Sequence, residues 1–301
     1  MPVVLISGGT GLIGTHLSTM LREKGYEIII LSREAGEGRA VWNIPENKID
    51  MDAVARADYI IHLAGASVAE KRWTKKRKKE ILNSRTQSSA LLIRALKETN
   101  NHVKAFISAS AIGWYGPDTG ISKKHGFVES EPSSPDFLGE TCNAWETSVD
   151  PINSLGIRLI KLRTGIVFSK QGGALDSFKK PINAGIATVL GNGQQVISWI
   201  HIDDLCRMYI YAMENENMHG IYNAVSPSPV TNESLVLALA KKLKGKFFIS
   251  IHVPSFMLKI ILGEMSIEVL KSATVSCAKI KTENFLFLFP SLDAAFADVI
   301  K

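Results

Sequence analysis

VVLISGGTGLIGTHLSTMLREKG, residues 3–25, is the stretch of this sequence that decides the fold. The apolar run VVLIS predicts a buried strand, and from His16 to Lys24 the apolar residues have helical spacing. Glycines stand between them at positions 8, 11 and 14. A strand, a GxxGxxG turn and a helix in this order predict a turn that binds the pyrophosphate of a dinucleotide. The competing interpretation is a tight turn without a ligand.

Each glycine of this turn has its own physical role. Gly8 permits the tight turn, Gly11 lets the backbone approach the pyrophosphate, and Gly14 allows the helix to pack closely on the strand. Free N–H groups at the N-terminus of the helix attract the anion. The predicted binding turn consists of Gly8, Thr10, Gly11, Leu12, Ile13 and Gly14.

The alternation of strands and helices continues outward from this turn. Strands that alternate with helices imply right-handed crossovers and a mostly parallel sheet that is covered on both faces. The predicted fold class is therefore α/β, a Rossmann-type doubly wound parallel sheet. Apolar runs predict strands at 27–31, 59–64, 103–110 and 157–163, and helical spacing predicts helices over 75–97 and 138–153.

Beyond about Arg163 the alternation of strands and helices becomes less regular, and we expect a smaller lobe there. The predicted domains are 1–165, which binds the dinucleotide and to which about 195–225 returns, and 166–301, a smaller substrate lobe with a C-terminal domain. In this part we predict a helix over 174–184, a turn at 191–193, a helix opened by Asp203 or Asp204, a helix capped at Thr231, a short strand at 285–290 and a closing helix over 291–300.

The end of the second strand bears on the choice between NAD and NADP. NAD sites place a carboxylate about 20 residues after the turn, where it binds the ribose 2′-hydroxyl. Ser32 and Arg33 stand there instead, and Arg33 can form charge-assisted hydrogen bonds with a 2′-phosphate. Glu34 weakens this inference, and Arg39, in the following loop, is either a second cation for the phosphate or an exposed arginine. The predicted cofactor is NADP(H).

The third strand ends in the small residues of HLAGAS, 62–67, where the chain must pass close to the adenosine and the pyrophosphate. Leu63 and Ala64 are the predicted contacts. His62 is predicted to be packed within the strand rather than to act as a catalyst.

The net charge of +6 suits an anionic partner, and nucleic acid, acidic lipid and a phosphorylated cofactor all qualify. Much of the excess lies in KRWTKKRKK, residues 71–79. We interpret this run as the solvated start of a helix. A nearby phosphate is an alternative, because cations at a helix N-terminus oppose the macrodipole, and nucleic acid is a third. We predict neither a nucleic-acid nor a membrane partner.

Cysteine usage and the start of the chain bear on the compartment. Cys142, Cys206 and Cys277 lie far apart, which argues against a disulfide framework and shows no metal-ligand spacing. The sequence enters an apolar strand at once, without a signal peptide, and no apolar run reaches the roughly 20 residues of a membrane span. We expect a cytoplasmic protein without a metal.

Several motifs occur in the order of a known family. With SGGTGLIG, HLAG, SASAIGWYG, LRTGIVFS and WIHIDD, nearly the whole chain resembles the extended short-chain dehydrogenase/reductase superfamily. RWTKKRKKEILNSR, GGAL, SWIHIDDL and the tail FLFPSLDAAFADVI resemble its "epimerase family protein" subgroup, which adds a short C-terminal domain of unknown function. This resemblance implies NADP contacts at Ser32, Arg33, Leu63, Ala64, Glu80, Arg85 and Val167. From the sequence pattern alone, Glu80 and Arg85 look like an ordinary exposed pair on a helix.

The chain departs from the superfamily at the residues that do the chemistry. In active members a Tyr-x-x-x-Lys pair transfers the proton and holds the nicotinamide ribose, beside a serine or threonine after the fourth strand. Ser110 matches the serine, but Leu138 and Cys142 occupy the tyrosine and lysine positions and can do neither task.

Three other groups near this position have two interpretations each. Tyr115 is either a substitute acid or a residue that lines the pocket. Cys142 is either a reactive thiol or packed core. His201, with Asp203 and Asp204, is either a charged pair at the start of a helix or an N-cap and its neighbour.

Two functions follow, and a third is weaker. The first is an NADP-dependent oxidoreductase or epimerase that acts on a small polar, sugar-nucleotide-like substrate between the lobes. The alternative is an NADP(H)-binding regulator without turnover, and the third is nucleic-acid binding through residues 71–79. The resemblance also implies a homodimer through the helices that begin at Lys75 and Leu138.

Overall fold

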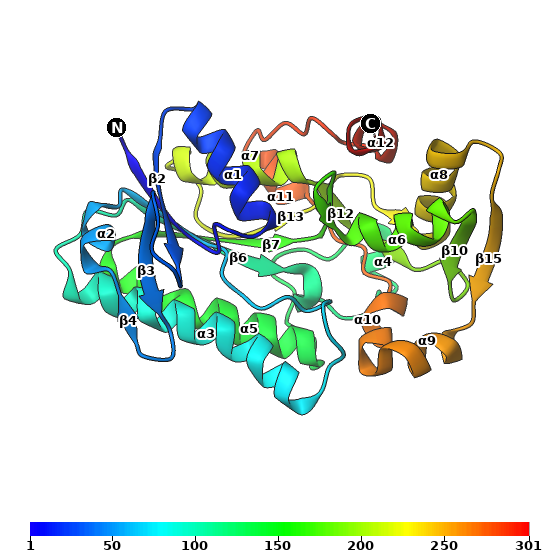
Figure 1. The fold of residues 1–301 in the computed structure, drawn as a ribbon, viewed down its shortest axis with the longest axis horizontal. Coiled ribbons are helices and arrows are strands. Elements are labelled where there is room, and N and C mark those ends of the chain that lie inside the picture. The colour runs from blue at the N-terminus through cyan, green and yellow to red at the C-terminus, as the bar shows by residue number, and fades with distance from the viewer. Residues whose placement is uncertain (301) are drawn as a thin grey trace.

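A parallel sheet forms the centre of the larger lobe in the computed structural model, which describes residues 1–300 (Figure 1). Its eight strands have the order β13-β7-β6-β5-β1-β2-β3-β4, and all neighbours are parallel except β3 and β4. This confirms the predicted doubly wound fold class. The strands are β1 (Val3–Ser7), β2 (Glu27–Ser32), β3 (Arg39–Asn43), β4 (Lys48–Ile49), β5 (Tyr59–His62), β6 (Ala105–Ala111), β7 (Arg158–Thr164) and β13 (Gly220–Ala224).

Helices cover both faces of this sheet because successive residues of a buried strand point to opposite sides. Val4 and Ile6 of β1 pack with Leu17 on one side, whereas Leu5 packs with Leu92 on the other. Figure 1 shows α1 and α7 along one face and α3 and α5 along the other. The helices of the two faces are α1 (Leu12–Glu23), α7 (Ile202–Glu214) and α11 (Ala278–Thr282) on the first, and α2 (Met51–Arg56), α3 (Lys75–Glu98) and α5 (Phe137–Val149) on the second.

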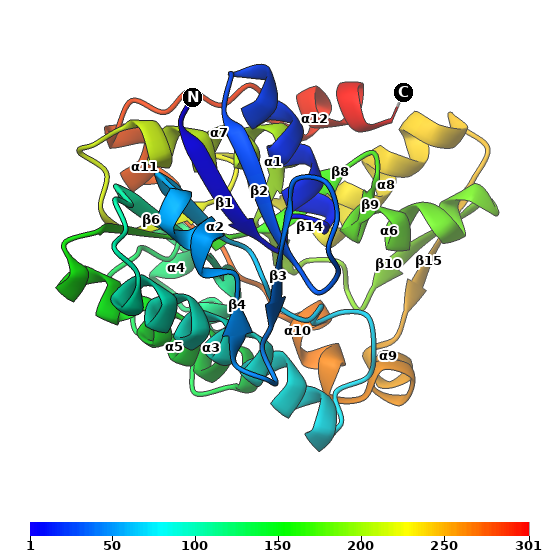
Figure 2. The ribbon, with the colours of Figure 1, turned by 60° about the vertical axis from the view of Figure 1, so that its left-hand side comes forward.

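The smaller lobe has its own core, in which Phe168 and Trp199 stack with ring centroids 5.0 Å apart. Figure 2 shows its strands and helices beside the large sheet. Its strands are β8 (Ile166–Ser169), β9 (Gly172–Gly173), β10 (Ile186–Leu190), β11 (Val196–Ile197), β12 (Trp199–His201), β14 (Val230–Thr231) and β15 (Ile249–Val253). Its helices are α6 (Ala174–Asn183), α8 (Asn232–Lys244), α9 (Ser255–Leu262), α10 (Ser266–Leu270) and α12 (Leu292–Val299), and α4 (Ser122–His125) lies in the loop after β6.

Most predicted elements are confirmed, with boundaries moved by a few residues. The first helix begins at Leu12 rather than His16, because Gly11 already serves as its N-cap. The helix predicted to reach residue 153 ends at Val149 and continues as a 3-10 turn to Leu155, with Pro151 in its first turn. Arg39, predicted in a loop, is the first residue of β3. The helix over 174–184, the turn at 191–193, the Thr231 cap and the closing helix are confirmed.

Two predictions near the C-terminal end of the large sheet are wrong. Residues 285–290 form no strand, because the backbone N–H groups of Leu288 and Phe289 donate to the carboxylate of Asp204, each at 2.8 Å, instead of to a neighbouring strand. Helix α7 opens neither at Asp203 nor at Asp204. Its N-cap is His201, whose Nδ1 accepts from the N–H of Asp203 at 3.1 Å.

Within residues 1–300, no helix combines the length and the apolar character that a membrane crossing needs.

Candidate functional site

The glycine turn has the geometry that its sequence predicts. Gly8 has a φ of +74°, and a Cβ there would lie 2.9 Å from the backbone nitrogen of Ala64. A Cβ on Gly14 would lie 2.4 Å from the carbonyl oxygen of Gly8, so helix α1 touches the turn directly. The space above Gly11 is open, with the Gly8 carbonyl oxygen at 3.4 Å as the only neighbour of a Cβ. No side chain caps α1, so its first N–H groups face this open space without a side-chain acceptor.

The segment after β5 lies directly against this turn and is fastened to helix α3. Leu63 donates its N–H to the Ser7 carbonyl at 3.0 Å. The Ser84 hydroxyl accepts from the N–H of Ala66 at 2.9 Å, and Nη1 of Arg85 donates to the Ala66 carbonyl at 3.1 Å. The structure therefore brings Leu63, Ala64 and Arg85 to the edge of the sheet where the glycine turn lies.

Ser32 ends β2 at the same edge, and Arg33 follows it. The Ser32 hydroxyl accepts from the N–H of Glu34 at 3.2 Å, and the side chains of Arg33 and Glu34 are exposed. Within residues 1–300, the Arg33 guanidinium makes no ion pair or hydrogen bond. It is therefore free to meet an anionic group from solvent.

Glu80 does not pair with Arg85, so the interpretation of the two as a helix pair is wrong. The exposed Glu80 carboxylate lies 2.9 Å from Nη1 of Arg77. Arg77, which the sequence reasoning missed, is buried and donates to the Ser67 carbonyl. Its position within a lysine-rich run masked this role, because neighbouring residues of the run are exposed.

Val167 reaches the same region from the smaller lobe. It lies on β8, and a Cβ on Gly173 would stand 3.1 Å from the Leu12 side chain and 3.7 Å from the Val167 carbonyl oxygen. Gly173 thus lies between β8 and the N-terminus of α1. Residues from both lobes meet at the glycine turn.

His62 is fully buried beneath the turn, as predicted for a packed strand residue. Its Nδ1 contacts the Ser7 hydroxyl, and its Nε2 contacts Ser88 and Ser89 at 3.3 and 3.2 Å. Burial, with a smaller effect of the Arg85 charge, lowers the pKa of His62 from 6.5 to about 3. The imidazole is therefore neutral at physiological pH, and its role is to form hydrogen bonds with the serines around it.

This lowered pKa predicts a pH-dependent stability. Below pH 6.5 the unfolded chain binds a proton at His62 that the folded chain refuses until about pH 3. The contribution of His62 to the free energy of unfolding should therefore fall as the pH drops through this window, by up to about 1.4 kcal/mol per pH unit, and stay constant above it. Urea unfolding of wild type and His62→Gln between these pH values measures the slope, which should be smaller in the variant. The exposed His125→Gln is the control, and equal slopes in all three proteins would contradict the prediction.

Ser110 takes part in a buried ionic network. Its hydroxyl donates to Oε1 of Glu146 at 2.6 Å, and Nε and Nη2 of Arg163 donate to the same carboxylate at 2.8 and 3.0 Å. Arg163 is 0% exposed and its guanidinium lies 3.7 Å from the centre of the Trp114 ring. The carboxylate thus has three hydrogen bonds, and Ser110 is held by it rather than pointing freely into a cavity.

Tyr115 belongs to this network and not to a pocket wall. Its side chain is fully buried and stacks on Phe127 with centroids 5.0 Å apart. Its hydroxyl donates to Asn223 at 2.8 Å and accepts from Arg163 at 3.0 Å. Burial outweighs the Arg163 charge and raises the pKa of Tyr115 to about 12. Neither role that we predicted for it, substitute acid or pocket lining, fits this buried position.

Leu138 and Cys142, which the sequence aligns with the superfamily pair, lie beside the strand that carries Ser110. A Cβ on Gly113 would meet Leu138 at 3.2 Å and the Cys142 sulfur at 3.7 Å. The thiol is buried and donates to the Ala111 carbonyl at 3.6 Å. Burial, with a smaller effect of the Glu146 charge, raises the pKa of Cys142 to about 12. The packed-core interpretation of Cys142 is therefore confirmed, because an un-ionised thiol is a poor nucleophile.

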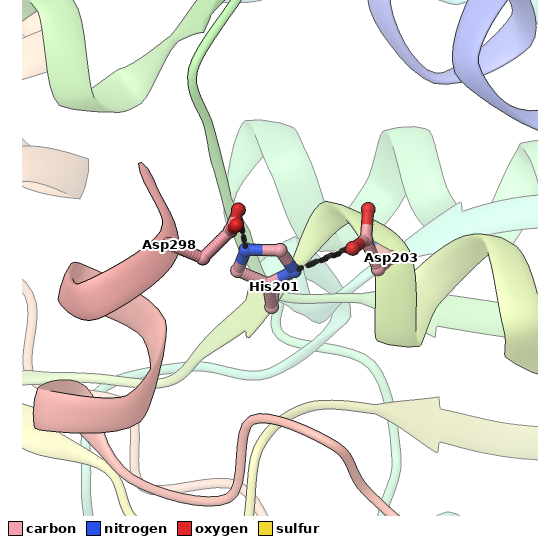
Figure 3. Close-up of side chains that lie close together, drawn as sticks. All are labelled: His201, Asp203 and Asp298. Carbon is pink, nitrogen blue, oxygen red and sulfur yellow. Dashed lines mark hydrogen bonds and ion pairs between the residues drawn. The ribbon is translucent and has the colours of Figure 1, made fainter. Parts of the chain in front are cut away.

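His201 forms a charged cluster that includes a residue far away in sequence. Its two ring nitrogens face different carboxylates, with Nδ1 3.9 Å from Asp203 and Nε2 3.4 Å from Asp298 of α12 (Figure 3). Burial lowers the pKa of His201 against the opposing effect of these carboxylates. Asp203 also contacts Nε2 of His16 at 2.6 Å. One ligand atom from each of His201, Asp203 and Asp298 lies within 4.8 Å of the other two, and the contact of Asp203 with His16 links the cluster to α1.

A groove of about 790 Å³ begins at the glycine turn and follows the outer side of α1. Thr10, Gly11 and Leu12 form its end, while Asp203 and Arg207 give it a charged wall. Ser32, Arg33, Leu63 and Ala64 do not line it, so only its end coincides with the predicted dinucleotide contacts. Its full lining is Thr10, Gly11, Leu12, Thr15, His16, Thr19, Met20, Glu23, Gln171, Asp203, Arg207 and Leu288.

Comparison with solved structures shows the same architecture in related proteins. The human epimerase family protein SDR39U1 (isoform 2), solved with NADPH, superposes with a TM-score of 0.86 at 28% identity and covers 99% of this chain and 98% of its own. The nucleoside-diphosphate sugar epimerase of Corynebacterium glutamicum superposes with a TM-score of 0.78 at 29% identity, over 99% of this chain and 58% of its own.

Sequence comparisons agree over the whole length. The epimerase family protein SDR39U1 of Mus musculus is 31% identical over 99% of both chains. An epimerase family protein of Staphylococcus aureus is 33% identical over 100% of both chains. The profile of the NAD dependent epimerase/dehydratase family matches residues 4–224, and that of a domain of unknown function (DUF1731) matches residues 253–299. The chain therefore belongs to the NAD dependent epimerase/dehydratase family and carries this additional C-terminal domain.

Proposed function

We propose that the protein binds NADP(H) at the carboxyl edge of the large sheet, with the pyrophosphate on the glycine turn. The observation that carries this proposal is the uncapped N-terminus of α1 beside the open backbone of Gly11. Unpaired N–H groups and the helix dipole attract an anion at such a position. The similar human protein was solved with NADPH, which supports the same cofactor here.

The preference for NADP(H) over NAD(H) is assigned to Arg33. Its guanidinium is exposed and unpaired at the end of β2, where a 2′-phosphate would lie. Arg85 acts indirectly, because it holds the segment that contains Leu63 and Ala64 in place. Val167 and Leu12 close the other end of the site. Glu80 is exposed and paired with Arg77, and we assign it no contact with the cofactor.

We infer that the reaction is that of an NADP-dependent oxidoreductase or epimerase on a small polar, sugar-nucleotide-like substrate. Bound NADP(H) supplies or accepts the hydride. Among the chain's own residues, Arg163 and Glu146 hold the Ser110 hydroxyl in place. Because Leu138 and the un-ionised Cys142 cannot relay a proton, the substrate's proton is exchanged with another group or with water.

The second candidate is an NADP(H)-binding regulator without turnover. The observation that favours it is that Leu138 and the buried Cys142 stand at the positions that the sequence aligns with the superfamily's tyrosine and lysine. Incubation of the NADPH and NADP⁺ forms with a panel of carbonyls, alcohols and sugar nucleotides separates the two candidates. Oxidation, reduction or epimerisation of one compound supports the enzyme, and binding of cofactor without any conversion supports the regulator.

Calorimetric titration with NADPH and NADH tests the cofactor site. Wild type should prefer NADPH, and Arg33→Ala should weaken NADPH binding about tenfold or more, because a charge-assisted hydrogen bond contributes roughly 1.5–3 kcal/mol. NADH binding should stay unchanged. Arg22→Ala removes an exposed arginine from α1 as the matched control. Equal affinities of wild type for both cofactors, or no binding of either, would refute the proposed specificity.

A further inference from the structure

The C-terminal domain exposes an unusual number of large apolar side chains on one short helix. In α9 only Leu258 is buried, while Phe256, Met257, Ile260 and Ile261 are 63%, 42%, 70% and 60% exposed. These four residues lie at positions i, i+1, i+4 and i+5, so they form one continuous stripe on the side of the helix away from Leu258. Ile267 of the adjoining α10 is 59% exposed and adds to this apolar surface.

A group of unpaired cations lies on α9 and on the segment of residues 71–79 next to it. The Arg72 guanidinium packs over Gly263, where a Cβ would stand 2.8 Å from its Nη2, and Lys78 of α3 pairs with Glu264. Figures 1 and 2 both show α9, α10 and the first turns of α3 close together in the lower part of the view. We call this region the α3–α9 surface. Its exposed cations are Lys71, Arg72, Lys75, Lys76, Lys79 and Lys259.

The acidic residues of the same region do not neutralise these six cations. Glu70 and Glu80 contact the buried Arg77, Glu264 contacts Lys78, and Glu268 contacts Lys271. Within residues 1–300, none of the six exposed cations forms an ion pair. The surface therefore presents a net positive charge together with apolar side chains.

We propose that the α3–α9 surface docks on a lipid bilayer that contains anionic lipids, a partner that the sequence reasoning did not predict. Apolar side chains of an interfacial helix enter the boundary between headgroups and acyl chains, and neighbouring lysines bind the phosphates. This combination explains both features at once, whereas a nucleic acid would use the cations and leave the apolar stripe in water. In a two-fold contact with a second copy, the cations of one copy would face and repel the same cations of the other. No helix needs to cross the bilayer, in agreement with the lengths in the described chain.

Sedimentation with vesicles tests this proposal, which is independent of the cofactor site. Wild type should sediment with vesicles of equal parts phosphatidylcholine and phosphatidylglycerol, remain in solution with phosphatidylcholine alone, and be released by high salt. Removal of three lysines should weaken binding on the order of a hundredfold, since each contributes about fivefold. The charge variant is Lys75→Ala with Lys76→Ala and Lys79→Ala, and its control is Lys97→Ala with Lys241→Ala and Lys242→Ala, which are also exposed.

A second pair of variants tests the contribution of the apolar stripe. Ile260→Ser should weaken vesicle binding, whereas Leu286→Ser, which removes an equally exposed apolar side chain far from the α3–α9 surface, should not. Far-UV circular dichroism and NADPH titration verify that each variant is folded. Wild type that stays in solution with both kinds of vesicle overturns the proposal. Two other results would also overturn it if vesicle binding is absent. One is binding of labelled oligonucleotides that is lost in the charge variant or in Ile260→Ser. The other is a dimer in light scattering that is lost in either of these variants.

Discussion

Replacement of Glu146 with leucine should lower the free energy of unfolding by about 3–5 kcal/mol, the cost of leaving a buried charge without its partner. The partner is Arg163, which is fully buried and donates two hydrogen bonds to the carboxylate. Without Glu146, the guanidinium keeps only the Tyr115 hydroxyl and the Glu129 carbonyl as acceptors. Urea unfolding monitored by circular dichroism gives the change directly.

Two further variants show whether the loss of stability comes from this buried ion pair or would follow the loss of any ion pair. Glu98→Ala removes a pair with Arg94 whose side chains are 51% and 35% exposed, and it should change the stability by less than about 0.5 kcal/mol. Glu146→Leu combined with Arg163→Met should recover part of the loss, because no unpaired buried charge remains. A single Glu146→Leu variant as stable as Glu98→Ala would show that the network is not held by this pair.

Gly14→Ala should disrupt both the fold of the turn and the affinity for NADPH. The added Cβ would lie 2.4 Å from the Gly8 carbonyl oxygen and 2.6 Å from the Gly9 Cα, and both are backbone atoms that cannot rotate away. Helix α1 must therefore shift, at a cost of about 1–3 kcal/mol in stability. NADPH affinity should fall on the order of a hundredfold, because the displaced N–H groups would lose two charge-assisted hydrogen bonds.

Calorimetry with NADPH and urea unfolding measure the two effects of Gly14→Ala. Gly120→Ala is the matched control, because its Cβ would meet no atom within 4 Å and its φ is not positive. This control should behave as wild type in both measurements. An undiminished NADPH affinity in Gly14→Ala would mean that the close contact between helix and turn does not shape the cofactor site.

The parts of the site that depend on short-range pattern could be predicted from the sequence. Glycine spacing placed the turn, because the positive φ of Gly8 and the contact of Gly14 with Gly8 and Gly9 depend on backbone geometry within a few residues. The apolar surroundings of His62 and Cys142 gave their burial, since strand and helix periodicity decide which face meets the core. Even so, the sequence pattern missed His201 as the N-cap of α7, where the first aspartate was the more usual choice.

Interactions between distant segments were decided only by the tertiary structure. Tyr115 stood out as the phenol nearest to Ser110 in sequence, yet its hydroxyl bonds to Asn223 of β13, which returns to the sheet beside β7. Residues 285–290 had the composition of a strand, but the N–H groups of Leu288 and Phe289 donate to the Asp204 carboxylate instead. Periodicity and turn geometry depend on a few neighbouring residues, so the local sequence predicts them. The partner of a buried polar group depends instead on which distant segments pack together. The sequence alone therefore determined the sheet, its covering helices and the glycine turn, and only the packed chain determined how the charges around Ser110 and His201 are paired.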